Sequence, residues 1–466
     1  MARNRVIYQS QAVYAQQTDY ATGAASIRAA GKSDICELDR VQSANYSFSI
    51  ARTDVNQFGN LAAIDQIVTE APTVSLDISY YQANLQNEEY LGFEILESGR
   101  ISGFTSCISK LIDNDNVASQ KNYYILTSKE GADVNMDTSG ALNNTGNYAP
   151  NKGASIIGVG NAFVNSYSSE ASVGGVPTAS VSIEGQNMNV VNLPYTGADG
   201  ATNATGYNGV GLRTNYTRSS ASEQQLVGIS GLSPAVNPVD GSSYHADICL
   251  PAGKSNPAST GAGPISTLRA GDLTLTLQTQ STAAYINADD AKVADRVTAE
   301  NEIAMVGNSG NVMNAIDYFG PTVDNAKIQS YTLSTDFGRS ALQQLGNRFA
   351  STRLIEFPLS VSLSVDAVVS DMTSGSLGEL IDCEQKYDAR ITMKDPTCDD
   401  PQRAGNAGAP AVINYIVKGM KLDSISYNSD IGSNQTATLD FTAQVGSPEQ
   451  KSHGLFMSGW HLQAAN

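Results

Sequence analysis

Apolar and polar residues alternate one by one in several short stretches of this chain. In 74–80, Val, Leu, Ile and Tyr occupy the even positions, with Ser, Asp and Ser between them. The stretches 46–50, 179–184, 361–366 and 437–442 alternate in the same way. A period of two residues is typical of a strand with one buried and one wet face. The pattern predicts a mainly β protein built of antiparallel sandwiches or barrels.

The same strand pattern occurs twice along the chain. The segments that match at a shift of 287 (328 − 41) are Val41-Gln42-Ser43 with Ile328-Gln329-Ser330, Arg52-Thr53 with Arg339-Ser340, and Val74-Ser75-Leu76 with Val361-Ser362-Leu363. Gly174 and Gly432, each followed by Thr-Ala after three residues, match at a shift of 258 (432 − 174). The difference of 29 residues (287 − 258) indicates a longer loop in the first copy, which we assign to the Gly- and Asn-rich stretch 131–153.

These matches predict two tandem β domains. The expected boundaries are 5–190 for copy one, 191–264 for a loop-rich linker or small β insertion, 265–450 for copy two and 451–466 for a C-terminal tail. The Gly, Pro and Asn content of the insertion is typical of exposed loops. One short helix is expected in each copy, at 103–112 and at 377–385.

The wet faces of the repeated strands carry Ser, Thr, Asp and Glu, with no Lys or Arg. The residues expected on this face are Ser75, Asp77, Ser79, Ser180, Ser182, Glu184, Ser362, Ser364, Asp366, Thr438, Asp440 and Thr442. A solvated sheet face is the ordinary explanation of such residues. Solvated faces usually mix both signs of charge, however, so the same bias in both copies favours a selected polar-to-acidic surface.

The overall charge agrees with an acidic surface. Only 16% of the 466 residues are charged, and 46 acidic against 28 basic residues leave a net charge of −18. A protein that grips nucleic acid needs a basic surface, and no Lys/Arg cluster is present, so stable nucleic-acid binding is disfavoured. We expect no signal peptide and no membrane span, because no apolar run is long enough.

The five cysteines do not suggest a disulfide framework. They are Cys36, Cys107, Cys249, Cys383 and Cys398. An odd number without a CxxC pair favours folding in a reducing cytoplasm.

Catalytic and metal-binding motifs are not evident. Gly253-Lys254-Ser255 and Gly31-Lys32-Ser33 lack the first glycine of a phosphate loop, and the Asp/Asn run 113–116 lacks the later residues of a calcium loop. His245, Asp247 and Cys249 would share one face of a strand, but no second ligand pair with suitable spacing follows. We therefore predict no enzymatic activity, no cofactor and no metal.

The repeated strands resemble a known family. The segments that carry the resemblance are 42–48 (QSANYSF), 52–59 (RTDVNQFG), 160–168 and 173–181. They look like the major tail (tail tube) proteins of long-tailed bacteriophages, and the resemblance covers both copies.

The resemblance implies a virion protein that assembles in the host bacterial cytoplasm into rings, which stack into a tube that conducts DNA. Because the unit is duplicated, three chains would supply six copies, so a trimer can imitate a hexameric ring. The implied partners are further copies of this chain, the tape-measure, terminator and baseplate proteins of the tail, and DNA in transient, non-specific passage. The twelve wet-face residues are the ones expected to face the lumen, and an acidic lumen would repel phosphates and let DNA slide.

Two other functions remain open from the sequence. A virion decoration protein or adhesin of tandem sandwiches would remain monomeric and expose apolar binding patches. A β-rich polysaccharide hydrolase would need two carboxylates that converge in a cleft.

Overall fold

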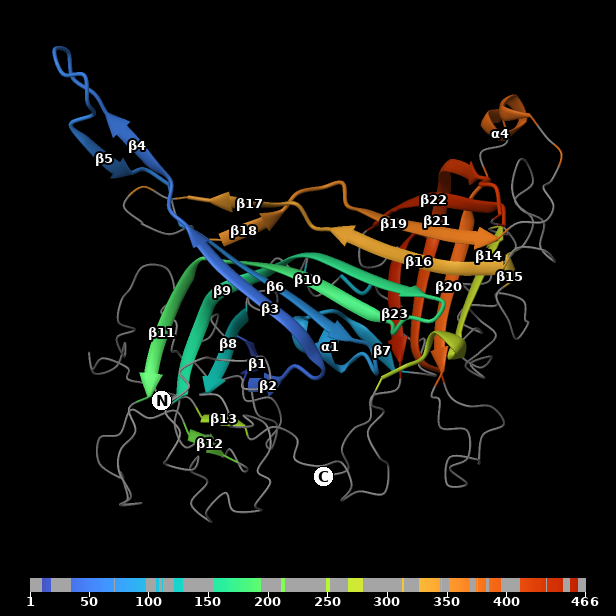
Figure 1. Ribbon diagram of the computed structural model, residues 1–466, viewed down its shortest axis with the longest axis horizontal. Coiled ribbons are helices and arrows are strands. Elements are labelled where there is room, and N and C mark those ends of the chain that lie inside the picture. Colours follow the sequence, from blue (N-terminus) through green and yellow to red (C-terminus); the bar gives the residue numbers. More distant parts are fainter. Residues whose placement is uncertain are drawn as a thin grey trace, which may run out of the picture.

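The computed structural model (Figure 1) describes most of the predicted β structure. The residues described are 11–17, 35–70, 72–97, 106–108, 111, 121–128, 154–193, 211–213, 249–251, 267–279, 312–313, 327–343, 345, 352–368, 374, 376–382, 385–394, 411–432, 434–446 and 453–459. They are mainly strands in antiparallel sheets, which confirms the predicted fold class.

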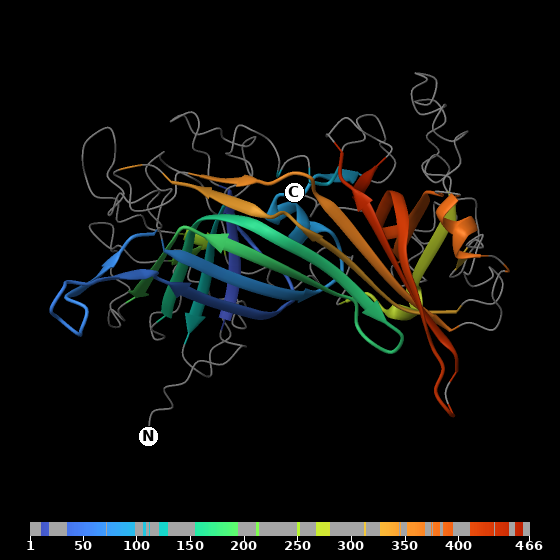
Figure 2. The same ribbon diagram turned by 90° about the horizontal axis from the view of Figure 1, so that it is seen from above.

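Eight antiparallel strands form one continuous sheet to which both copies contribute, here called the shared sheet. In spatial order they are β3 (Val41–Ser49), β6 (Thr73–Tyr81), β10 (Thr178–Gly185), β9 (Ala154–Ser172), β16 (Lys327–Asp336), β19 (Ser360–Val368), β22 (Thr436–Gln444) and β21 (Ala411–Asn428). The first four strands belong to copy one and the last four to copy two, and they follow one another along the molecule (Figure 2).

A second layer packs against the shared sheet in each copy. In copy one it contains β2 (Ile35–Glu37), β1 (Gln11–Gln17), β8 (Lys121–Ser128), the first half of β9, and β11 (Asn187–Leu193). In copy two it contains β15 (Val312–Met313), β14 (Leu273–Thr279), β20 (Tyr387–Lys394), the first half of β21, β23 (Gly454–Gly459) and β7 (Ile95–Glu97). Because β7 comes from copy one, the two copies are joined in this layer as well.

The remaining elements lie outside the two layers or connect them. They are β4 (Arg52–Val55) paired with β5 (Asp65–Val68), β17 (Arg339–Leu342) paired with β18 (Thr352–Ile355), β12 (Gly211–Arg213) paired in parallel with β13 (Cys249–Pro251), the helices α1 (Gln86–Leu91) and α4 (Leu377–Asp382), and the 3-10 turn η3 (Ala270–Asp272). Most of the predicted insertion 191–264 and of the tail 451–466 lies outside the described residues.

The strands of the shared sheet repeat residue by residue. The pairing of β3 with β6 skips Gln42, and the pairing of β16 with β19 skips Gln329. Likewise β9 bulges at Asn165 and β21 at Asp423. These bulges coincide at the shifts of 287 (329 − 42) and 258 (423 − 165) read from the sequence. A bulge changes the course of a strand, so its repetition makes both halves of the sheet curve alike.

The repeated glutamines have a local role at these bulges. The side-chain amide of Gln42 donates to the Arg40 carbonyl over 3.0 Å, and that of Gln329 donates to the Lys327 carbonyl over 3.2 Å. Each bulge therefore receives the same bond from its own side chain. This contact accounts for the repeated Val/Ile-Gln-Ser motif in structural terms.

The two helices match the sequence expectations unequally. Helix α4 lies within the expected 377–385. Of the expected helix at 103–112, the structure describes 106–108, where Cys107 and Ile108 form a turn, and Leu111, which is helical. Helix α1 was not anticipated, because six residues are too few to show a helical period.

A buried polar network crosses the boundary between the copies. Glu88 in α1 accepts hydrogen bonds from the hydroxyls of Tyr80 (2.9 Å) and Tyr167 (3.1 Å). The Tyr167 hydroxyl lies 2.8 Å from that of Tyr415 in copy two, to which Gln82 also donates over 2.7 Å. Because all three tyrosines and Glu88 are buried, this network ties β6, β9, α1 and β21 together in the core.

Burial raises the pKa of Glu88 to about 7, although the bonds that it accepts act in the opposite direction. Below its unfolded value, near 4.5, the carboxyl is protonated in both states. Between that value and about 7 only the unfolded chain ionises, so the stabilising contribution of Glu88 is lost as the pH rises through the folded pKa.

We therefore predict that Glu88→Gln removes a pH dependence of folding. Relative to the variant, the natural chain should lose about 3 kcal/mol of unfolding free energy between pH 4 and pH 8. Urea unfolding of both proteins across this range measures the difference, and groups other than Glu88 cancel in it. Parallel profiles would contradict the raised pKa.

Candidate functional site: a polar sheet face between two sheet edges

All twelve of the predicted wet-face residues lie on one face of the shared sheet. Residues directly opposite one another in the ladder point to the same side, and the ladder joins all twelve. One row of hydroxyls crosses seven strands through Ser43, Ser79, Ser180, Ser168, Ser334, Ser362 and Thr442. The face therefore extends without interruption from copy one into copy two.

Several residues of this polar face were not picked out from the sequence. They are Ser43, Asn45, Ser47, Ser166, Ser168, Glu170, Ser172, Ser330, Thr332, Ser334, Asp336, Ser424, Ser426 and Asn428. An alternation is present in these strands, but in β9 the inward positions include Ser169, which weakens the apolar half of the signal.

Hydroxyls of adjacent strands hold two of the carboxylates. Asp366 accepts hydrogen bonds from Ser330 and Thr438, each over 2.6 Å. Asp440 accepts from Ser364 and Ser424, each over 2.7 Å. Neutral donors fix these carboxylates in place without cancelling their charge, so they contribute to a negative potential over the face.

Glu184 is different, and here the sequence interpretation needs correction. Its carboxylate lies 2.5 Å from the guanidinium of Arg353, which is almost completely buried. Lys421 also stands on this face, opposite Thr442 at the β21 edge. The strand alternation missed both cations because Arg353 arrives from a separate hairpin and Lys421 lies beside a bulge, where the period of two fails.

The junction between the copies is the antiparallel pairing of β9 with β16. Leu333 and Phe337 of copy two are completely buried there, and the Phe337 ring lies 6.2 Å from that of Phe93. Backbone bonds close both ends: Phe337 N–H donates to the Asn165 carbonyl and Val173 N–H to the Gln329 carbonyl, each over 2.8 Å. The junction thus combines a hydrogen-bonded ladder with a packed apolar core.

The two outermost strands of the shared sheet, β3 and β21, carry exposed apolar side chains at positions equivalent to buried residues of the internal junction. The shift of 287 relates Tyr46, Phe48 and Ile50 at the β3 edge to buried Leu333, Thr335 and Phe337, yet they are 38%, 59% and 42% exposed. At the β21 edge, Tyr427 is exposed where its counterpart Ser169 is buried. In the described part of the chain, β3 pairs only with β6, and the second half of β21 pairs only with β22.

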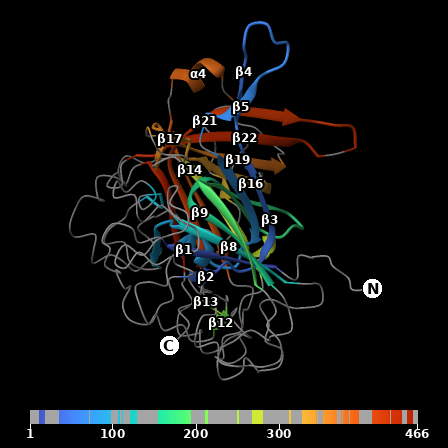
Figure 3. The same cartoon turned by 90° about the vertical axis from the view of Figure 1, so that its left-hand side faces the viewer.

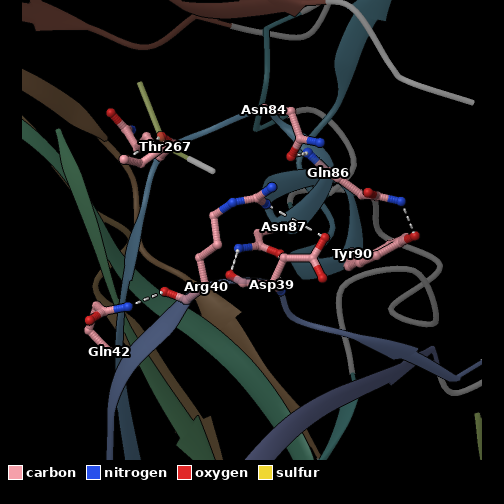
Figure 4. Close-up of polar contacts among 9 residues, drawn as sticks. Asp39, Arg40, Gln42, Asn84, Gln86, Asn87, Tyr90 and Thr267 are labelled. Carbon is pink, nitrogen blue, oxygen red and sulfur yellow. Dashed lines mark hydrogen bonds and ion pairs between the residues drawn. The ribbon is translucent and has the colours of Figure 1, made fainter. Parts of the chain in front are cut away.

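The start of the β3 edge is fixed from within the chain (Figure 4). Arg40 adopts a left-handed conformation (φ 60°) in the turn before β3. Asn87 of α1 bonds both backbone groups of Asp39: its carbonyl oxygen accepts from the N–H over 2.9 Å, and its amide donates to the carbonyl over 2.8 Å. These contacts fix the turn at Asp39 and Arg40, and thereby the direction in which β3 begins.

A hairpin, here called an arm, extends from each copy. The arm of copy two, β17–β18, lies along copy one, whereas the arm of copy one, β4–β5, projects from the body (Figures 1 and 3). Every residue from Arg52 to Val68 is exposed, and Phe58 and Leu61 at its tip are fully so. The arm of copy one therefore carries large apolar side chains that nothing in the described part of the chain covers.

Other residues considered from the sequence lie away from this site. His245 and Asp247 fall outside the described residues, as do 31–33, 113–116 and 253–255. Within the described ranges, no three His, Cys, Asp or Glu side chains group as metal ligands, and no helix is long and apolar enough to span a membrane.

Comparison with known proteins adds little to this picture. No family model and no curated protein matches the chain. A solved structure that matches is described as "Cryo-EM structure of the anti-feeding prophage (AFP) baseplate, 6-fold symmetrised", with 15% sequence identity and a TM-score of 0.18 over 29% of this chain and 90% of that chain. A TM-score this low carries no argument about fold or function.

We predict that Arg353→Gln destabilises the folded chain by about 2 kcal/mol, because it leaves the partly buried Glu184 without its cation. The repeat supplies a matched control: Gln66 occupies the equivalent position in the exposed arm, so Gln66→Arg should leave monomer stability unchanged. Urea unfolding midpoints test both variants. Equal midpoints for Arg353→Gln and the natural chain would show that the ion pair is energetically neutral.

Proposed function

We propose that this chain is a structural subunit of a bacteriophage tail tube, and that it forms rings by pairing the β21 edge of one copy with the β3 edge of the next. The observation that carries the proposal is the internal junction. Strand β16 is the repeat equivalent of β3, and β9 is that of β21, so the pairing of β9 with β16 is a head-to-tail contact between two unlike edges of the repeated fold. Repetition of one head-to-tail contact closes a ring when the rotation permits.

The internal junction also supplies the register of the proposed contact. The shifts of 287 and 258 convert the pair Leu333–Ser169 into Tyr46 of one chain opposite Tyr427 of the next. Phe48 would then face Ile425, and the exposed apolar residues of both edges would be covered. Ring closure also removes exposed sheet edges, which otherwise invite uncontrolled pairing.

Three chains per ring would give six copies and a closed shared sheet. The polar face would line the lumen, and its carboxylates and hydroxyls would repel or ignore phosphates instead of gripping them. Stacked rings would then form a conduit for DNA, with the tape-measure, terminator and baseplate proteins as further partners in the virion. A structural role of this kind requires neither catalysis nor a cofactor.

A charged residue at one edge should stop ring formation. Phe48→Lys places an ammonium group where the proposed neighbour would cover the side chain, so rings should be lost while the chain stays folded. Val190→Lys, at an exposed position on β11, is the control and should assemble normally. Negative-stain microscopy and sedimentation measure assembly, and circular dichroism checks folding.

The edge variant separates the proposal from a monomeric adhesin. Because Phe48→Lys chains retain an intact β21 edge, they should also cap natural chains and reduce ring yield when mixed with them. A natural chain that stays monomeric at every concentration, or rings that form equally well with Phe48→Lys, would overturn the proposal.

Lysines on the polar face should make assembled rings bind DNA. Asp77→Lys with Glu170→Lys changes the charge by +4 per chain (2 × 2), and both positions are exposed. Gel-shift assays should show DNA retention by the variant at low salt that disappears as salt screens the charges. The same +4 placed on the arms, by Glu70→Lys with Glu356→Lys, is the control. Equal retention by both variants would contradict a lumen-facing polar sheet.

A further inference from the structure

The arm of copy two shows how an arm can dock on a neighbouring copy. The Arg339 side chain donates to the Val164 carbonyl over 2.8 Å, and its guanidinium carbon lies 5.0 Å from the centre of the Phe163 ring. Burial lowers the pKa of Arg339 to about 10. Together with the Arg353–Glu184 ion pair, these contacts fasten β17–β18 across β9 and β10 of copy one.

The arm of copy one is built to the same plan. In β4–β5, Arg52 pairs with Val68 as Arg339 pairs with Ile355 in β17–β18. Each arm follows β3 or its repeat equivalent β16, yet among the described residues no strand of the other copy lies against β4–β5, which projects from the body (Figure 3). The counterpart of its docking surface lies at the opposite end of the shared sheet, on β21 and β22.

The repeat shifts identify that surface. They relate Arg339 to Arg52, Arg353 to Gln66, Phe163 to Lys421, Val164 to Leu422, Asn165 to Asp423 and Glu184 to Thr442. At the internal junction the carboxylate is that of Glu184 on β10, whereas on the equivalent surface it is that of Asp423 at the bulge of β21. In the structure, the Thr442 hydroxyl donates a hydrogen bond to Asp423, which holds this carboxylate on the exposed edge.

We propose that the β4–β5 arm docks across β21 and β22 of a second copy of this chain, with Arg52 against the Leu422 carbonyl and the Asp423 carboxylate, and Gln66 beside Thr442. The inference rests on the proposed ring and adds a contact that edge pairing alone does not require. The Phe163 ring that Arg339 contacts is replaced by Lys421 on the equivalent surface. The partner for Arg52 is instead the Asp423 carboxylate. Gln66 and Thr442 are both uncharged, whereas their equivalents Arg353 and Glu184 carry opposite charges and form an ion pair.

The two kinds of junction therefore differ in chemistry. The internal arm uses an ion pair between the buried Arg353 and the partly buried Glu184, and a cation–π contact. The arm between chains uses an Arg–Asp pair at the sheet edge beside Lys421, together with neutral hydrogen bonds, and this set of contacts is weaker and more sensitive to salt. Rings should consequently separate into intact chains before any chain loses its internal junction.

Cross-linking between separate chains tests the docking directly. Gln66→Cys chains are mixed with Thr442→Cys chains, allowed to assemble, and treated with a short bismaleimide. We expect a covalent two-chain product on denaturing gels, absent from the natural chain with its own five cysteines. The matched control mixes Arg353→Cys chains with Glu184→Cys chains, whose contact is internal, and should give no two-chain product.

A third mixture identifies the surface that the arm chooses. Gln66→Cys with Glu184→Cys should not cross-link, because Glu184 is covered by its own chain's arm. Rings without the Gln66–Thr442 product, or a Gln66–Glu184 product, would overturn the docking while leaving ring formation intact. Absence of rings and of every product would overturn the ring proposal and the docking together.

A charge exchange tests the named ion pair. Asp423→Arg should raise the concentration at which rings dissociate about fivefold, since it replaces the anion that faces Arg52 with a cation at a contact that already contains Lys421. Combining Arg52→Asp with Asp423→Arg should restore the natural value. Failure of the double variant to recover, with both single variants weakened, would show that the two residues act separately.

Discussion

The pairing of β9 with β16 is the contact on which the rest of this structure depends. It joins two copies of one fold into a single curved sheet and buries Leu333 and Phe337 at the seam. Because the contact is head-to-tail, it leaves one unlike edge at each end, β3 and β21. Two copies joined head to tail always leave one edge of each kind unpaired. In the described part of the chain, these are the edges that carry exposed apolar residues.

The copies have diverged where their surroundings differ. At the internal junction, Arg353 is paired with Glu184, and Tyr167, Tyr415 and Glu88 form a buried network that neither copy could complete alone. Covalent continuity keeps these groups together during folding, so buried polar contacts can form with well-defined partners. At the outer edges, the equivalent positions carry the uncharged Gln66 and Thr442 together with exposed apolar residues.

The polar face follows from the same arrangement. Each strand contributes alternate Ser, Thr, Asp or Glu residues, and the ladder places them in rows, so hydroxyl groups from neighbouring strands reach Asp366 and Asp440. These rows need continuous register across the β9–β16 seam. The β9–β16 ladder keeps its register from Ser166 to Ser172. The repeated bulges at Asn165 and Asp423 lie outside this ladder and bend both halves of the sheet alike.

The sequence by itself determined the β class, the duplication, the two shifts and the twelve polar-face residues, because strand alternation and repeated motifs can be recognised within short segments. It missed α1, which is too short to show a period, and it misjudged Glu184, whose partner Arg353 lies 169 positions away (353 − 184). Only the tertiary structure decided that the copies share one sheet, that Glu88 is buried between them and that one arm is docked while the other projects. Each of these depends on which distant segments meet, and the alternation of residues within a strand carries no information about the strand that will lie beside it.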